Sequence, residues 1–217
     1  MNKKTVGFLG TFYGNTLEAV SACKRLMEEL AKQIKEMPTN IKENIVLLIV
    51  EDGTENDWIK EYENSNIKYI RLDKNYGVSY ARNVGLDYLI DNVDYICFLD
   101  MDDIIEDNYL RVMHEYCADR THEIIESTFL INGEAAPFIR NSVRCGVAGS
   151  ALQTKIIGDE RFKNELQIGE DTDFMHRVCD LSKYRKKHAP TQYIYQLGIN
   201  KESLTMKYNR REIEKER

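Results

Sequence analysis

Short apolar segments alternate with helical patterns through the first half of the chain, and this alternation limits the fold more than any other feature. The apolar segments cover residues 5–10, 44–50, 67–72 and 94–99. Each is typical of a strand that is buried on both faces. The helical patterns cover residues 16–37, 56–63 and 78–90, and the first of them stops at Pro38. We therefore predict an α/β fold built on a doubly wound, mostly parallel sheet.

The second half of the chain is less regular. Its helical patterns cover residues 108–118 and 170–181, its strand patterns cover 123–131, 138–142 and 191–197, and a flexible stretch is expected at 146–149. This mixture predicts a smaller, mixed region that closes over the first half. We expect one domain over residues 1–217, with a nucleotide-binding half to about residue 105, a mixed half over about 106–205 and a charged tail over 206–217.

Composition narrows the class of protein. The 217 residues are 42% hydrophobic, and 30 basic against 36 acidic side chains leave a net charge of -6, which argues against a nucleic-acid partner. The five cysteines are dispersed, without a Cys-x-x-Cys pair, as expected of reduced thiols. No apolar stretch approaches the ~20 residues that a transmembrane helix needs. We expect a cytoplasmic protein without a transmembrane segment.

Three carboxylates follow the fourth predicted strand, as Asp100, Asp102 and Asp103. Ligands of open α/β sheets bind at the carboxyl ends of the strands, and alternate residues of an extended chain point the same way. Such charges repel one another unless a cation lies among them, and Mg²⁺ or Mn²⁺ prefers oxygen ligands. Asp100 and Asp102 are therefore predicted metal ligands. The alternative is a solvated acidic loop in which Asp103 or Asp107 caps the next helix.

The common phosphate-binding loops are missing from the sequence. No Gly-x-Gly-x-x-Gly follows the first strand, and no Gly-Lys-Ser/Thr occurs. Asp52 ends the second strand, and its side chain should therefore face the same crevice as Asp100. A nucleotide diphosphate bound in this crevice would need a metal ion to neutralise it.

Four motifs in this order resemble the inverting glycosyltransferases of family 2, which have the GT-A fold. They are Glu-Asp-Gly-Thr at 51–54, Asn-x-Gly-x-x-x-Ala-Arg-Asn-x-Gly at 75–85, Phe-Leu-Asp-Met-Asp-Asp at 98–103 and Gly-Glu-Asp at 169–171. The similarity runs from about residue 5 to residue 205. Each motif alone is common, but the four together in family-like spacing are specific.

The resemblance implies a binding site for the nucleotide of a sugar donor. Asp52 corresponds to the residue that holds the nucleobase, and the adjacent Gly53 should let a planar base approach closely. Thr11 and Tyr13 fall in the loop that cradles the base, although this loop reads Gly-Thr-Phe-Tyr-Gly-Asn and departs from the usual Pro-Thr-Tyr-Asn. An Asp52 carboxylate would accept a hydrogen bond from the N3–H of uracil, which favours a uridine nucleotide.

The resemblance also assigns the metal and diphosphate region. Asp100 and Asp102 match the motif that binds the metal ion and the ribose, and Asp103 is expected to share either task. Arg82 and Asn83 match a segment that lines the donor site, with an ordinary solvated helix arginine as the alternative. Gln196 stands where relatives often carry arginine. Lys201 or Lys207 could neutralise the diphosphate instead, although an ordinary solvated lysine is the favoured interpretation of either.

Asp171 is implied to be the catalytic base. A sugar hydroxyl is a poor nucleophile, and a carboxylate that accepts its proton accelerates the reaction by about 10²–10⁴-fold. The alternative is that Glu170, Asp171 and Asp173 form an acidic first turn that stabilises a helix dipole. The two roles are compatible.

The implied function is the transfer of a hexosyl or N-acetylhexosaminyl group, with inversion, from a nucleotide diphosphate sugar to a hydroxyl acceptor. The donor is expected to be a UDP-sugar, the cofactor Mn²⁺ or Mg²⁺, and the acceptor an unnamed glycan, glycolipid or protein. Two other readings are a nucleotidyltransferase and a non-catalytic nucleotide- or carbohydrate-binding module on the same fold. The first usually has a Gly-rich loop with Arg and Lys after strand one, which residues 10–15 lack.

Overall fold

The computed structural model describes residues 3–135, 146–166 and 168–196. Within these residues nine strands form one sheet, in the order β3-β2-β1-β4-β8-β6-β9-β5, with β7 paired to β6. The first four strands in the chain are parallel neighbours. Their bounds are β1 Lys4–Phe12, β2 Ile45–Glu51, β3 Ile67–Arg71 and β4 Val93–Asp100. The predicted parallel α/β core is confirmed.

The remaining strands make the other half of the sheet mixed. β8 is antiparallel to β4 and to β6, whereas β6 and β9 are parallel and β5 is antiparallel to β9. Their bounds are β5 Ile104–Ile105, β6 Ile124–Ile131, β7 Glu134–Ala135, β8 Ser150–Gln153 and β9 Lys186–Tyr195. The expected division of the chain into a nucleotide half and an acceptor half stays a prediction.

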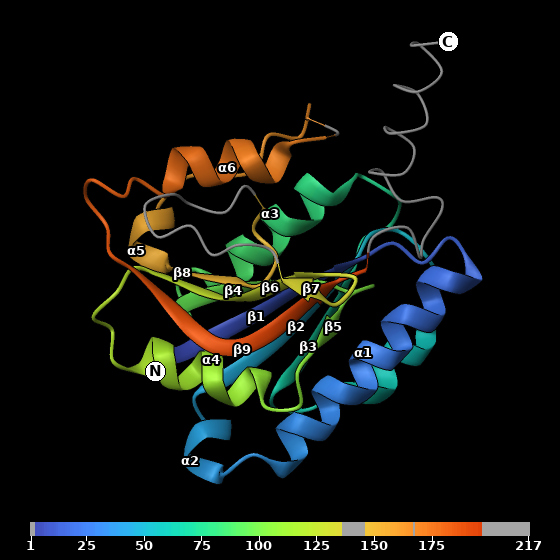
Figure 1. Ribbon diagram of the computed structural model, residues 1–217. Helices are drawn as coiled ribbons and strands as arrows, with labels where there is room; N and C mark the ends of the chain where they lie inside the picture. The colour runs from blue at the N-terminus through green and yellow to red at the C-terminus, as the bar shows by residue number, and fades with distance from the viewer. Residues whose placement is uncertain (1–2, 136–145, 167, 197–217) are drawn as a thin grey trace.

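Helices cover both faces of the sheet (Figure 1). Apolar side chains of α1 and α4 pack on one face and those of α3, α5 and α6 on the other, so that the sheet lies between two buried layers. The helices are α1 Leu17–Glu36, α2 Thr39–Lys42, α3 Val78–Leu89, α4 Tyr109–Ala118, α5 Thr154–Ile157 and α6 Glu170–Val178, with the 3₁₀ helix η1 at Asp57–Tyr62. Thr16 caps α1 by accepting a hydrogen bond from the N–H of Ala19 at 3.1 Å.

Some expectations about the second half were wrong. The last strand begins at Lys186 rather than near residue 191. The stretch expected to be flexible contains the buried Val147 and Ala148, and Ala148 pairs with Phe98 beside β4. Neither Asp103 nor Asp107 caps α4, whose N-cap is Asn108. The strand expected at 138–142 and the tail at 206–217 lie outside the described residues.

Among the described segments, we find no helix with the length and apolar character that crossing a membrane requires.

Candidate active site

The carboxyl ends of the parallel strands bring several of the predicted residues together. Thr11 in β1 pairs in register with Asp100 at the end of β4. On its other side β1 pairs with β2, and the N–H of Asp52 donates to the carbonyl of Phe12 at 2.8 Å. Tyr13 follows on the next loop with 42% of its surface exposed. Thr11, Tyr13, Asp52 and Asp100 therefore lie along one edge of the sheet, as predicted.

The Asp52 carboxylate accepts hydrogen bonds from the protein backbone. Its side chain accepts hydrogen bonds from the backbone N–H groups of Tyr76 at 2.7 Å and Gly77 at 2.8 Å, and only 3% of the residue is exposed. Burial raises the pKa of Asp52, although the two amides oppose the shift. Gly77 is the N-cap of α3 and supplies no side-chain cap. Asp52 thus fixes the start of α3 from a different loop.

Gly53 does not leave the open approach that we expected for a planar base. Its φ is +74°, and a Cβ there would lie 1.9 Å from the carbonyl carbon of Lys74 and 2.2 Å from the backbone nitrogen of Asn75. The close neighbour is therefore the loop that follows β3. Only glycine fits both the positive φ and this packing.

Glu51 belongs to the first of the four motifs, but the sequence assigned no role to it. It is fully buried, and its Oε1 accepts hydrogen bonds from the Thr54 hydroxyl at 2.8 Å and from the N–H of Asn56 at 2.9 Å. Thr54 in turn accepts from the N–H of Gly14 at 3.2 Å. Burial alone would raise the pKa of Glu51, but these bonds and those from Tyr69 and Arg71 hold it below its usual value. Glu51 thereby joins the loop after β2 to the loop that carries Tyr13.

The three carboxylates after β4 are crowded. Burial and the neighbouring Asp100 raise the pKa of Asp102 to about 6. Burial, Asp100 and Asp102 raise the pKa of Asp103 to about 9. Asp103 is fully buried; its Oδ1 accepts from the N–H of Gln196 at 2.9 Å, and its Oδ2 has no hydrogen-bond partner within the described residues. Asp103 is therefore buried in the protein near the end of β4, which does not agree with the expected direct contact to a nucleotide or metal.

The geometry of a metal site is incomplete in the protein alone. Over residues 3–135, 146–166 and 168–196 no set of three or more His, Cys, Asp or Glu side chains is arranged to hold a metal ion. Mg²⁺ and Mn²⁺ in nucleotide sites commonly take only one or two carboxylates and complete their shell with phosphate oxygens and water. Asp100 and Asp102 fit that pattern. Burial and then repulsion from Asp100 raise the pKa of Asp102, and a divalent ion would relieve the repulsion.

Arg82 is buried between two carboxylates. Its Nη2 lies 3.0 Å from Asp100 Oδ1 and its Nη1 lies 2.8 Å from Glu170 Oε1, with 5% of the residue exposed. Burial disfavours the charged guanidinium, but Asp100, Glu170 and Asp171 outweigh it and raise the pKa of Arg82. We expected Arg82 to line the donor site. Its guanidinium connects the end of β4 with the start of α6, and the expected place of Arg82 beside the donor stays a prediction.

Asp171 lies in the first turn of α6, partly exposed. Its Oδ1 accepts from the N–H of Thr172 at 2.7 Å. Burial raises the pKa of Asp171 and Asp100 adds to the shift, while Arg82 and the Thr172 amide oppose it. A Cβ on Gly146 would lie 3.2 Å from Asp171 Oδ2, so that the glycine leaves room beside the carboxylate. A partly exposed carboxylate with a raised pKa suits a general base.

The other acids of this first turn are paired with cations. Glu170 binds Arg82, and Asp173 lies 2.7 Å from Lys163 Nζ and 2.8 Å from Arg177 Nε. In the part of the chain that the structure describes, Asp171 forms no ion pair of this kind. Asp171 is therefore the acid of this turn best placed to accept a proton.

Two further contacts support the site and carry no simple sequence signal. The side chain of Asn83 pairs with the backbone of Phe162, accepting from its N–H at 2.8 Å and donating to its carbonyl at 2.9 Å. The Tyr193 hydroxyl accepts a hydrogen bond from the N–H of Asp100 at 2.8 Å. Phe162 and Tyr193 are distant in sequence from the residues that they hold, so periodicity could not reveal them.

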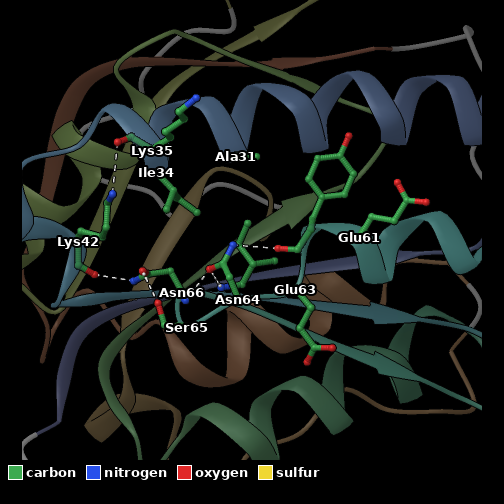
Figure 2. A pocket seen from close by; sticks show the side chains of 11 residues that line it. Ala31, Ile34, Lys35, Lys42, Glu61, Glu63, Asn64, Ser65 and Asn66 are labelled. Atoms are coloured by element: carbon green, nitrogen blue, oxygen red, sulfur yellow. Dashed lines mark hydrogen bonds between the residues drawn. The ribbon is translucent and has the colours of Figure 1, made fainter.

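A cavity of about 520 Å³ lies elsewhere in the molecule (Figure 2). It is lined by the second half of α1, by Lys42 and by residues 61–67, where β3 begins. The Asn66 amide donates to the carbonyls of Lys42 and Ile45 at 2.6 and 3.1 Å, and so holds one wall of the cavity together. Because β3 starts here, this cavity is at the opposite end of the strands from Asp100.

Comparison with known proteins identifies the family. The family model described as "Glycosyl transferase family 2" matches residues 20–190. This chain belongs to glycosyl transferase family 2. The family assignment that the four motifs predicted is thus confirmed. The matched residues of this chain include Asp52, Arg82, Asp100 and Asp171.

Solved structures confirm the fold of this family 2 member. The structure of S. aureus TarS 1-349 in complex with UDP-GlcNAc superposes with a TM-score of 0.70 over 88% of this chain and 58% of that one, at 18% identity. GalNAc-T7 with UDP, GalNAc and Mn²⁺ superposes with a TM-score of 0.64 over 90% of this chain and 44% of that one, at 14% identity. At these identities the likeness shows the GT-A-like fold.

Curated relatives match parts of the chain. "Minor teichoic acid biosynthesis protein GgaA" of Bacillus subtilis is 33% identical over 87 residues, which are 37% of this chain and 19% of that protein. "Teichoic acid poly(glycerol phosphate) polymerase" of Staphylococcus epidermidis is 34% identical over 110 residues, which are 48% of this chain and 13% of that protein. The matched segments therefore cover less than a fifth of the length of either relative.

Proposed function

We propose that this chain is a metal-dependent inverting glycosyltransferase that moves a sugar from a UDP-sugar to a hydroxyl acceptor. The observation that carries the proposal is the convergence of Asp100 and Asp171 around the buried Arg82, which binds Asp100 and Glu170 at 3.0 and 2.8 Å. A carboxylate suited to a metal–diphosphate complex and a carboxylate suited to a base thus interact with the same guanidinium. Membership of glycosyl transferase family 2 supports this reading.

The donor assignment rests on the loops at the ends of β1 and β2. Thr11 and Tyr13 offer a hydroxyl and an exposed aromatic ring beside Asp100, suited to a ribose and a planar base. Each carboxylate oxygen of Asp52 accepts one backbone hydrogen bond and has a second lone pair that is available for another. It can therefore accept from uracil while it holds Tyr76 and Gly77. UDP-GlcNAc in the TarS complex and UDP in the GalNAc-T7 complex favour the same nucleotide.

The chemistry follows from the residues in the crevice. Asp171 accepts the proton of the acceptor hydroxyl while that oxygen forms its bond to the anomeric carbon. The bond from the anomeric carbon to the diphosphate oxygen breaks with its electron pair, and UDP leaves. A single displacement of this kind inverts the anomeric centre. Asp100 and Asp102 would hold Mn²⁺ or Mg²⁺, which would neutralise the charge that develops on the departing diphosphate.

The proposal is tested by UDP release. The protein is incubated with Mn²⁺ or EDTA, with UDP-GlcNAc, UDP-GalNAc or UDP-glucose, and with acceptors that include poly(glycerol phosphate), because two partial relatives are named for teichoic acids. We expect Mn²⁺-dependent UDP release that an acceptor accelerates and that Asp171→Asn removes.

Two outcomes would contradict the proposal. If no nucleotide sugar releases UDP and none raises the melting temperature, the binding-module reading is favoured. If the protein instead releases pyrophosphate from UTP and a sugar phosphate, it is a nucleotidyltransferase.

A further inference from the structure

Two consecutive residues of α3 reach different parts of the active site. Arg82 binds Asp100 at the end of β4 and Glu170 at the start of α6. Asn83 pairs with both polar backbone groups of Phe162, at 2.8 and 2.9 Å. Through these two residues, one turn of α3 contacts the end of β4, the start of α6 and the loop that precedes α6.

The loop held by Asn83 is itself packed against α6. The Phe162 ring stacks on the Phe174 ring with centroids 4.0 Å apart and planes 13° apart. The guanidinium carbon of Arg82 lies 5.3 Å from the centroid of the Phe162 ring. Helix α6 is thus tied to α3 at Glu170, through an ion pair, and at Phe174, through Phe162 and Asn83.

The charges explain why such a connection is needed. Asp100, Glu170 and Asp171 all interact with the buried guanidinium of Arg82. At short range in a partly buried site, like charges repel one another strongly unless a cation lies between them. Without the guanidinium, the first turn of α6 would move away from the end of β4. Lysine would not replace it, because one ammonium lacks the planar fork that binds two carboxylates at once.

We propose that Arg82 and Asn83 are positioning residues that set where Asp171 lies relative to Asp100, so that they control turnover and not donor affinity. This inference rests on the proposed function. Arg82 acts through Glu170 and Asp100, and Asn83 acts through Phe162 and Phe174. A displacement of about 1 Å at a reacting group can lower a rate by about 10²-fold.

The test compares Arg82→Lys and Asn83→Ala with a matched control, Asn92→Ala. Asn92 lies just beyond the other end of α3 and donates one side-chain hydrogen bond, to the carbonyl of Tyr88 at 2.7 Å. For each protein the turnover number and KM with UDP-GlcNAc are measured, together with the dissociation constant of UDP in Mn²⁺. We expect kcat to fall by about 10- to 100-fold in Arg82→Lys and Asn83→Ala with UDP affinity within about twofold, and Asn92→Ala to resemble the unmodified protein.

A second measurement does not depend on activity. Hydrogen exchange of the amides of α6, Glu170–Val178, should be faster in Arg82→Lys and Asn83→Ala and unchanged in Asn92→Ala. If the unmodified protein turns over no nucleotide sugar while α6 exchange changes as expected, the proposed function fails and the positioning role stands.

The inference is overturned by either of two results. The first is unchanged α6 exchange in both variants, which means that α3 does not hold the helix. The second is a loss of UDP affinity that parallels the loss of kcat/KM, which means that Arg82 or Asn83 acts on the donor.

Discussion

Replacing Glu51 with glutamine tests whether the buried carboxylate organises the donor loops. Oε1 accepts from Thr54 and from two nitrogens of Asn56, and Oε2 accepts from the Tyr69 hydroxyl and from Arg71 Nε. The amide oxygen of glutamine can keep the first set. Its NH₂ group would face Tyr69 and Arg71, and the Tyr69 hydroxyl can turn to accept from it.

The loss is therefore one charged hydrogen bond, that of Arg71 Nε at 3.0 Å. A hydrogen bond to a charged group contributes about 1.5–3 kcal/mol, and we take the lower half of this range because the Arg71 side chain is 26% exposed and Arg71 keeps its 2.9 Å bond to Tyr69. We expect Glu51→Gln to lower the free energy of unfolding by about 1.5–2 kcal/mol, measured by urea denaturation at pH 7.

Asp57→Asn is the matched control, because Asp57 binds the same arginine at 2.9 Å with 75% of its side chain exposed. Its loss should be much smaller than that of Glu51→Gln, because water screens an exposed ion pair. Folding lowers the pKa of Glu51 from its usual value of 4.5. The stabilisation that the ionised Glu51 gives to the folded protein is therefore complete above pH 4.5, and it is lost as the pH falls through the pKa of Glu51 in the folded state. Equal losses in the two variants, or a loss below about 0.5 kcal/mol in Glu51→Gln, would refute the reasoning.

Three further predictions concern the base, the metal and a buried histidine. Asp171→Asn should lower turnover by about 10²-fold or more with UDP affinity nearly intact, and a change of only a few-fold would move the role to Glu170 or Asp173. Asp102→Asn should abolish the Mn²⁺-dependent rise in melting temperature that UDP causes; equal UDP affinity with and without metal in the unmodified protein would contradict this. Burial lowers the pKa of His114, and neither of its ring nitrogens has a hydrogen-bond partner within the described residues. The unfolded chain therefore binds a proton first as the pH falls through about 6.5, which lowers stability by no more than ~1.4 kcal/mol per pH unit. The difference between the unfolding free energies of His114→Leu and the unmodified protein should shift in favour of the variant between pH 7.5 and pH 5.5, and a constant difference would exclude this.

Local signals are enough to place most of the first half of the molecule. Thr16 and Pro38 bracket α1 because a side-chain cap and a missing N–H act within a few residues of the chain. The apolar runs become β1 to β4 because strands buried on both faces are continuously apolar. Asp100 then lies at the carboxyl edge because it directly follows such a strand. The shorter elements α2, α5, β5, β7 and β8 were not predicted, since they are too short to show a period.

Only the tertiary structure decided the partners of the charged residues. Arg82 and Glu170 are 88 positions apart, and Asp52 binds amides 24 and 25 positions further along the chain. Sequence could assign Arg82 and Asp52 to the site, but it could not show which groups of the folded chain contact them. The reason is physical: the free energy of a buried carboxylate or guanidinium depends on which groups the folded chain brings within about 3 Å, and no local pattern encodes that distance.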